Sequence, residues 1–154
     1  SSLFKHLETL IEQAKRNDSK LAMAMLDLDG FKSVNDKYGH LAGDKLLVEV
    51  ARRLKQALRK SDYVARLAGD EFILLITNYN NHEELLSVLE KKRLSVAKPM
   101  LIDLPAENIE VKISCSIGVV EWSESKTIEN LVSLADSQLY EGKRLGKDRV
   151  SFIN

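Results

Sequence analysis

The chain has 154 residues, of which 44% are hydrophobic and 30% charged, and its 23 Lys and Arg side chains balance 23 Asp and Glu side chains. The lack of net positive charge argues against nucleic acid or an anionic membrane as a partner. A single cysteine, Cys115, excludes an internal disulfide, and no apolar run is long enough to span a bilayer. We therefore expect a cytoplasmic domain without direct membrane contact.

The predicted elements alternate between helices and strands. Because a helix pattern begins almost at once after Ser1, we expect residues 1–154 to be one domain excised from a longer multidomain protein. This expectation is compatible with a parent protein that is anchored in a membrane by another segment. Gly39 and Gly43 are expected to separate the second and third helices. Helices that alternate irregularly with hairpin-joined strands favour an α+β, ferredoxin-like fold with a mostly antiparallel central sheet flanked by helices. Predicted helices cover residues 3–14, 31–38, 47–58, 83–96 and 128–145, and predicted strands cover 21–26, 63–65, 72–76, 100–104, 109–121 and 150–153.

An acidic two-residue turn stands between two of these strands. Gly69 supplies the positive φ that a type II′ turn needs, which puts the carboxylates of Asp70 and Glu71 at a rigid tip. Asp27 follows the first strand, so three carboxylates converge if the strands are neighbours, and such hard oxygen ligands suit Mg²⁺ in phosphoryl transfer. A solvated acidic turn is the alternative. A calcium loop of the EF-hand kind does not fit, because Phe31 stands where it needs an oxygen ligand.

A possible phosphate site follows the first acidic strand end. Gly30-Phe31-Lys32 opens a helix there, and free N–H groups at a helix start beside a lysine suit a triphosphate. A lysine that is simply solvated is the alternative. Asp44 offers acceptors to the adjacent N–H donors of guanine, and Asn35 offers a donor and an acceptor. Turn formation next to glycine is the other interpretation of these two residues.

Four segments carry a family resemblance. Residues 27–44 (DLDGFKSVNDKYGHLAGD) and 66–72 (RLAGDEF) look like the two main motifs of the GGDEF domain of bacterial diguanylate cyclases. Residues 114–118 and 135–143 resemble later motifs of that family, so the similarity covers nearly the whole chain. The resemblance implies a nucleotidyl-cyclase-type fold. It also implies a Mg-dependent nucleotidyltransferase that condenses two GTP molecules into cyclic di-GMP and releases two pyrophosphates.

The resemblance further implies roles for individual residues. Asp27 and Asp70 become ligands of Mg²⁺ (or Mn²⁺) together with the Leu28 carbonyl, while Asp70 and Glu71 form the catalytic acidic tip. Each domain of the family holds one GTP, so a homodimer is expected to be needed for catalysis. The implied guanine contacts are Asn35 and Asp44, and the other implied substrate contacts are Phe31, Lys32, Gly69, Lys143 and Lys147.

Residues 59–62 (RKSD) match an inhibitory motif of the family in sequence and spacing. The resemblance implies that Arg59 and Asp62 bind the product cyclic di-GMP, with the planar guanidinium fork contacting guanine and phosphate edges. A surface ion pair at the end of a helix is the alternative for such a tetrapeptide.

The chain departs from the family pattern at several positions. Ala68 replaces the first glycine of the signature, Lys147-Asp148 stands where the family usually has Arg-Asn, and Gly142 replaces a usual alanine. Ala68, together with the ending 149–154, which resembles the run into a following domain, leaves a second hypothesis open. The chain would then be a catalytically weak or inactive domain that binds GTP or cyclic di-GMP as a regulatory module beside a sensor or phosphodiesterase domain.

Overall fold

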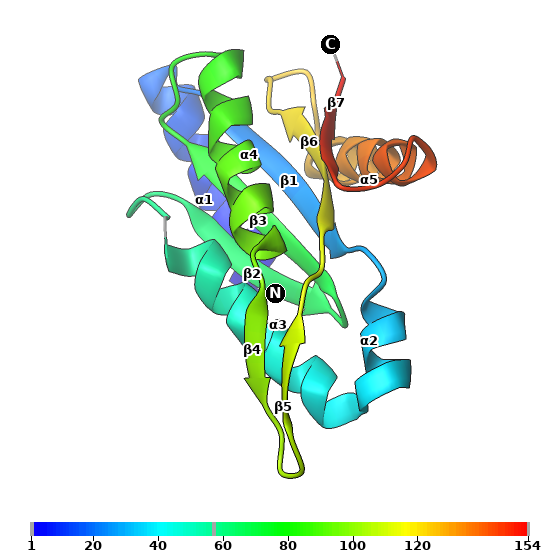
Figure 1. Cartoon of the computed structure of the whole chain (residues 1–154). Helices are drawn as coiled ribbons and strands as arrows, with labels where there is room; N and C mark the ends of the chain where they lie inside the picture. Colours follow the sequence, from blue (N-terminus) through cyan, green and yellow to red (C-terminus); the bar gives the residue numbers. More distant parts are fainter. Residues whose placement is uncertain (1, 57, 154) are drawn as a thin grey trace.

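The computed structural model of the chain describes residues 2–56 and 58–153, whose helices pack against both faces of a central sheet (Figure 1). Within these ranges no helix combines the length and the apolar character needed to cross a bilayer. In chain order the elements are α1 (Ser2–Asn17), β1 (Leu21–Leu28), α2 (Phe31–Tyr38), α3 (His40–Gln56), β2 (Tyr63–Ala68), β3 (Glu71–Thr77), α4 (His82–Ala97), β4 (Met100–Asp103), β5 (Asn108–Val111), β6 (Cys115–Glu121), α5 (Ile128–Arg144) and β7 (Arg149–Phe152).

The central sheet has the strand order β2-β3-β1-β6-β7. Strand β1 lies in the middle and pairs antiparallel with β3 and β6, and β2 pairs antiparallel with β3. The first four strands in this order have the ferredoxin-like arrangement, which confirms the predicted α+β fold with a mostly antiparallel sheet. Strand β7 pairs parallel with β6 after the α5 crossover, and β4 and β5 form a separate ribbon.

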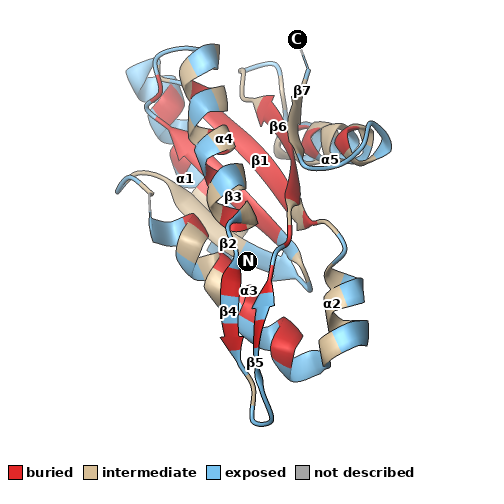
Figure 2. Ribbon diagram, in the orientation of Figure 1, coloured by how far each residue is buried: buried red, intermediate tan, exposed pale blue. Residues whose placement is uncertain are grey.

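Side chains from the two faces of β1 enter two hydrophobic cores. Ala24 and Leu26 belong to the core under α3 and α4, whereas Met23 and Met25 belong to the core under α1 and α5. Figure 2 shows β1, β3 and β6 buried along most of their length. Burial on both faces explains why these strands have continuous apolar runs and not an alternating pattern.

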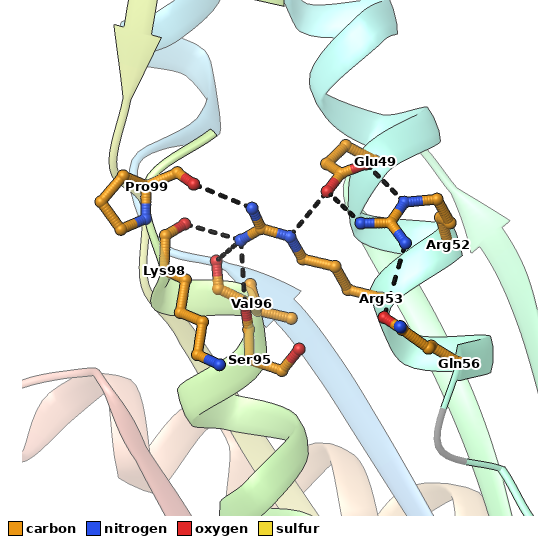
Figure 3. A network of polar contacts seen from close by, with 8 residues as sticks. All are labelled: Glu49, Arg52, Arg53, Gln56, Ser95, Val96, Lys98 and Pro99. Carbon is orange, nitrogen blue, oxygen red and sulfur yellow. Dashed lines mark hydrogen bonds and ion pairs between the residues drawn. The ribbon is translucent and has the colours of Figure 1, made fainter. Parts of the chain in front are cut away.

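Arg53 of α3 binds the end of α4 (Figure 3). Its Nη1 lies within hydrogen-bonding distance of three carbonyl oxygens there, the shortest being 2.6 Å to Lys98, and its Nη2 donates to Pro99 O at 2.9 Å. The last carbonyls of a helix lack intrahelical donors, so the Arg53 cation caps α4. The Arg53 side chain is 11% exposed, whereas neighbouring Arg52, which also bonds Glu49, is 58% exposed.

Helix α5 lies close against β6 at Gly118. A Cβ atom at Gly118 would be 2.2 Å from Leu139 N and 2.3 Å from Ala135 O, which are backbone atoms of α5. No side chain fits between the two elements, so glycine sets how closely the helix approaches the sheet. The last turn of α5 in turn carries Lys143 to the end of β1, where its Nζ lies 3.0 Å from Asp27 Oδ2.

Three local expectations are wrong. The predicted strand over residues 109–121 is two strands in different sheets, because β5 pairs with β4 and β6 with β1. Gly43 does not separate two helices but lies inside α3, and Gly39 alone marks the end of α2, with φ 92°. Leu58, expected at the end of the third helix, lies beyond Gln56, where α3 ends.

Candidate active site

The acidic turn joins β2 to β3 and lies beside the end of β1. Its two residues are Gly69 and Asp70, of which only Gly69 has a positive φ (49°), as a type II′ turn requires. Asp27 lies opposite Glu71 in the β1–β3 ladder, and Leu28 N donates to Asp70 O at 3.3 Å. The structure therefore brings these acidic residues together at one edge of the sheet.

The Asp27 carboxylate has one oxygen in an ion pair and one buried oxygen without a partner among the described residues. Its Oδ1 is buried and has no hydrogen-bond partner among the described residues, while its Oδ2 contacts Lys143 Nζ. Burial and the nearby Asp70 carboxyl raise the pKa of Asp27, and Lys143 opposes that rise. Burial lowers the pKa of Lys143, but its carboxylate neighbours outweigh this effect and raise it. A buried carboxylate oxygen without a partner is an arrangement that a cation would stabilise.

The acidic edge is compatible with a magnesium-type ion, although it forms no complete protein cage. Among the described residues no group of three or more His, Cys, Asp or Glu side chains could hold a metal ion. Mg²⁺ is usually held by one or two carboxylates with substrate phosphates and water completing its shell. The free oxygen of Asp27, the neighbouring Asp70 and the adjacent main chain fit that kind of site.

Sequence analysis missed Asp29, which organises the same region. Its side chain is 6% exposed and accepts hydrogen bonds from Ser114 Oγ (2.8 Å), Ser116 Oγ (2.7 Å) and Asp148 N (3.0 Å). Lys143 Nζ lies 3.5 Å from Asp29 Oδ1. Asp29 thus joins β1, β6 and the segment after α5. Ser114 and Ser116, which interrupt an apolar strand pattern, were the sequence feature that could have predicted a buried polar partner.

The start of α2 has the geometry expected of an anion site. Gly30 precedes the helix with φ 79° and offers no side chain to cap the first N–H groups. Phe31, the first helical residue, is half-buried against the core. The Lys32 side chain is 91% exposed and lies 3.7 Å from Asp36, so it points into solvent and is not held at the helix start.

Asn35 and Asp44, the predicted base-reading pair, lie on α2 and α3. Asn35 Oδ1 is buried without a hydrogen-bond partner among the described residues, and a Cβ atom on Gly43 would lie 1.8 Å from it. The Asn35 amide therefore packs against the backbone next to Asp44, whose own side chain is exposed. The missing side chain of Gly43 makes room for Asn35, which is the physical reason for a glycine inside this helix.

The two lysines predicted to contact phosphate have different environments. Lys143 is half-buried between Asp27 and Asp29. Lys147 is exposed in the segment between α5 and β7, where its backbone has φ 63°. Ala68, the departure in the signature, is an exposed residue of β2 without a positive φ, so glycine is not required there.

The two charged residues of the RxxD motif form an ion pair. Arg59 Nε donates to Asp62 Oδ2 at 3.1 Å, Arg59 also bonds the carbonyl oxygens of Thr77 and Asn78, and the Asp62 side chain is only 2% exposed. Both residues line a cavity of about 280 Å³ between α3 and α4. Buried Lys92 lines it as well, with its Nζ donating to Leu54 O at 2.9 Å. The other lining residues are Arg53, Gln56, Val88, Lys91 and Ser95.

Several proteins of similar sequence are named as diguanylate cyclases. The bifunctional diguanylate cyclase/cyclic di-GMP phosphodiesterase MucR of Pseudomonas aeruginosa is 40% identical over 148 residues, covering 96% of this chain and 21% of MucR. Diguanylate cyclase A of Treponema denticola is 34% identical, covering 97% of this chain and 39% of that protein. Diguanylate cyclase DosC of Escherichia coli is 36% identical, covering 91% and 30%. The chain thus spans between a fifth and two fifths of the length of these relatives.

Solved structures and a family profile agree with this similarity. The GGDEF domain of PA1120 (TpbB or YfiN) from Pseudomonas aeruginosa has a TM-score of 0.91 at 32% identity, covering 100% of this chain and 89% of that one. The GGDEF domain of DgcB from Caulobacter crescentus, solved with c-di-GMP, has a TM-score of 0.88 at 26% identity, covering 97% and 87%. The profile described as "Diguanylate cyclase, GGDEF domain" matches residues 1–149. The chain therefore belongs to the GGDEF domain family of diguanylate cyclases.

Proposed function

We propose that this chain is a catalytic diguanylate cyclase domain, which condenses two GTP molecules into cyclic di-GMP and releases two pyrophosphates. The observation that carries the proposal is Asp27, a half-buried carboxylate beside Asp70 that contacts Lys143 through Oδ2, while its buried Oδ1 has no hydrogen-bond partner among the described residues. Such an arrangement is unfavourable for the empty fold and becomes favourable when a cation and a polyphosphate arrive. The names of its relatives support the same reaction.

The acidic edge would hold Mg²⁺ or Mn²⁺ through the Asp27 and Asp70 carboxylates and the Leu28 carbonyl. Such an ion, when bound, stabilises charge on phosphate oxygens and favours loss of the proton from the attacking 3′-hydroxyl. Glu71 lies opposite Asp27 on the exposed side of the tip, so it and Asp70 are the candidates to accept that proton.

The remaining residues would bind and orient GTP. The free N–H groups of Phe31 and Lys32, with Lys143 and Lys147, are suited to the triphosphate. Gly69 lets the nucleotide approach the turn without a side chain in the way. The Asn35 amide, which lies against Gly43, and the carboxylate of the next residue, Asp44, would contact the guanine edge.

Catalysis would require two copies of the domain, because each holds one GTP and the 3′-oxygen of one nucleotide must reach the α-phosphate of the other. We expect the domain to work in the cytoplasm, without nucleic acid and without direct membrane contact. The zero net charge agrees with the absence of both partners.

Product feedback is part of the proposal. Arg59 and Asp62 line a cavity with three further cations, Arg53, Lys91 and Lys92, which suits a ligand with two phosphates. The c-di-GMP complex of DgcB supports such binding in a relative. Arg59→Ala is expected to weaken cyclic di-GMP binding and to relieve inhibition, and unaltered inhibition in that variant would remove the site from the proposal.

The test is incubation of the purified chain, at concentrations high enough for dimers, with GTP and Mg²⁺, followed by chromatography of the products. We expect cyclic di-GMP and pyrophosphate from the unsubstituted chain. Asp70→Ala is expected to abolish turnover while its unfolding midpoint stays near that of the unsubstituted chain, because Asp70 is a half-buried turn residue beside the like-charged Asp27. Full turnover in Asp70→Ala would contradict the metal assignment.

A regulatory module that binds GTP or cyclic di-GMP without turnover is the alternative, and Ala68 in the signature is the observation that favours it. Ala68→Gly separates the two functions. A folded chain that binds GTP but forms no product, and is not rescued by Ala68→Gly or by a longer chain with its native upstream segment, would favour the regulatory module.

A further inference from the structure

The segment that follows α5 has an unusual backbone. Gly146, Lys147 and Asp148 all have positive φ angles, of 126°, 63° and 50°. A left-handed conformation is easy for glycine but strained for lysine and tolerated only somewhat better by aspartate. Two consecutive non-glycine residues in this region persist only if the surrounding structure holds them there.

Two side chains, those of Asp29 and Arg93, hold Asp148. Its backbone N donates to Asp29 Oδ2 at 3.0 Å. Its side-chain Oδ1 accepts from Nη1 of Arg93 at 2.5 Å, across from α4. The Arg93 side chain is only 17% exposed, and its Nε also donates to Glu90 Oε1 at 2.5 Å, so the guanidinium is fixed before it reaches Asp148. A fixed and half-buried cation restrains its partner more than a mobile surface cation does.

The same contacts continue into the candidate active site. Asp29, which holds the Asp148 amide, also lies 3.5 Å from Lys143, and Lys143 in turn contacts Asp27 at 3.0 Å. Lys147, the other lysine of the proposed triphosphate site, directly precedes Asp148 in the strained segment. One short series of contacts therefore connects Arg93 to Lys143, and the peptide bond before Asp148 connects it to Lys147.

We propose that Arg93 is a positioning residue for GTP binding, which fixes the left-handed segment 146–148 and thereby the two lysines that grip the triphosphate. The proposal rests on the proposed function, because it depends on Lys143 and Lys147 contacting GTP. Asp148 supplies the carboxylate that Arg93 meets.

The test is Arg93→Gln, with GTP turnover and amide hydrogen exchange measured on the same protein. We expect the KM for GTP to rise about fivefold with kcat nearly unchanged, because the variant loses an interaction that orients the two lysines for GTP binding. We also expect faster exchange at the Asp148 amide. Arg93→Lys, which keeps the charge but loses the fork, is expected to recover part of both effects.

Arg52→Gln is the matched control. Arg52 also pairs with a carboxylate on its own helix, at 2.7 Å to Glu49, but contacts neither the segment 146–148 nor Asp29 in the described structure. It is expected to leave KM and the exchange rate unchanged. A merely structural role for Arg93 would lower the unfolding midpoint and the amount of active protein, and hence the apparent kcat, at unchanged KM.

The outcomes separate this proposal from the proposed function. If the unsubstituted chain neither binds nor turns over GTP, the proposed function fails, and with it the role of Arg93 in GTP binding. Faster exchange at Asp148 in Arg93→Gln would then still establish that Arg93 holds the segment. If the unsubstituted chain is active and Arg93→Gln changes neither KM nor Asp148 exchange, the positioning role is refuted while the proposed function stands.

Discussion

Gly118→Ala is expected to damage both the stability and the activity of the domain. The added Cβ would meet backbone atoms of α5 at 2.2 Å and 2.3 Å, and neither can rotate away as a side chain could. Ordinary carbon contacts need about 3.5 Å, so α5 must move away from β6 by roughly 1 Å. Overpacking of this kind costs about 1–3 kcal/mol in the free energy of unfolding. A 1 Å displacement of Lys143 can lower turnover by about 100-fold.

The assay is urea denaturation followed by circular dichroism, with GTP turnover measured in parallel. Gly142→Ala is the matched control on α5 itself, because its Cβ would meet Ser151 Oγ at 2.6 Å, a side-chain atom that can turn aside. Alanine also favours a helix interior over glycine by about 1 kcal/mol, so we expect this control to be neutral or stabilising. A Gly118→Ala protein within about 0.5 kcal/mol of the unsubstituted chain would refute the packing argument.

Three further substitutions test other parts of the structure. Arg53→Met is expected to lower the free energy of unfolding by about 2–3 kcal/mol, because the carbonyls of Lys98 and Pro99 after α4 lose their arginine donor. Arg52 is exposed, so Arg52→Met should change the free energy of unfolding by less than about 0.5 kcal/mol. Urea denaturation of the two variants tests this, and equal losses would contradict the capping role. Lys143→Met is expected to lower the free energy of unfolding by about 2 kcal/mol and to remove most of the GTP turnover, because Asp27 and Asp29 lose their shared cation. A variant of unchanged stability would show that these ion pairs do not stabilise the fold. Burial lowers the pKa of Lys92 below its unfolded value near 10.5, so between the two pKa values the folded chain binds fewer protons there than the unfolded chain. The contribution of Lys92 to stability therefore rises as pH increases from its folded pKa towards 10.5. The unfolding free energy of the unsubstituted chain minus that of Lys92→Met should rise over that interval, and a flat difference would contradict the burial of the charge.

The parts of the fold that follow from local patterns were predictable. Strand β1 and the turn at Gly69 have strong signals, an uninterrupted apolar run and a glycine before an acid, and the structure has both. The split of residues 109–121 was not predictable, because residues 112–114 (KIS) carry no proline or glycine to mark a break. Only the pairing partners, β4 for one half and β1 for the other, separate them.

The site was predictable in its acids but not in its supporting contacts. The position of Asp27 near the end of an apolar run is visible in the sequence. The burial of Asp29 is not, because it depends on Ser114 and Ser116, which lie 85 and 87 positions further along the chain. The left-handed backbone at Lys147 and Asp148 has no sequence signal, because neither residue type favours it strongly. It depends on Arg93 and Asp29, which come from other elements.

The irregular edge of the sheet bears on how two copies of the domain can meet. Strand β2 is the outermost strand on one side, and its pairing with β3 shifts register between Arg66 and Ala68. Strand β7 closes the other side with only four residues. Bulged and short edge strands are poor templates for a neighbouring strand, which discourages two sheets from merging into one. The two copies that the proposed function requires are therefore expected to meet through side chains and not by joining their sheets.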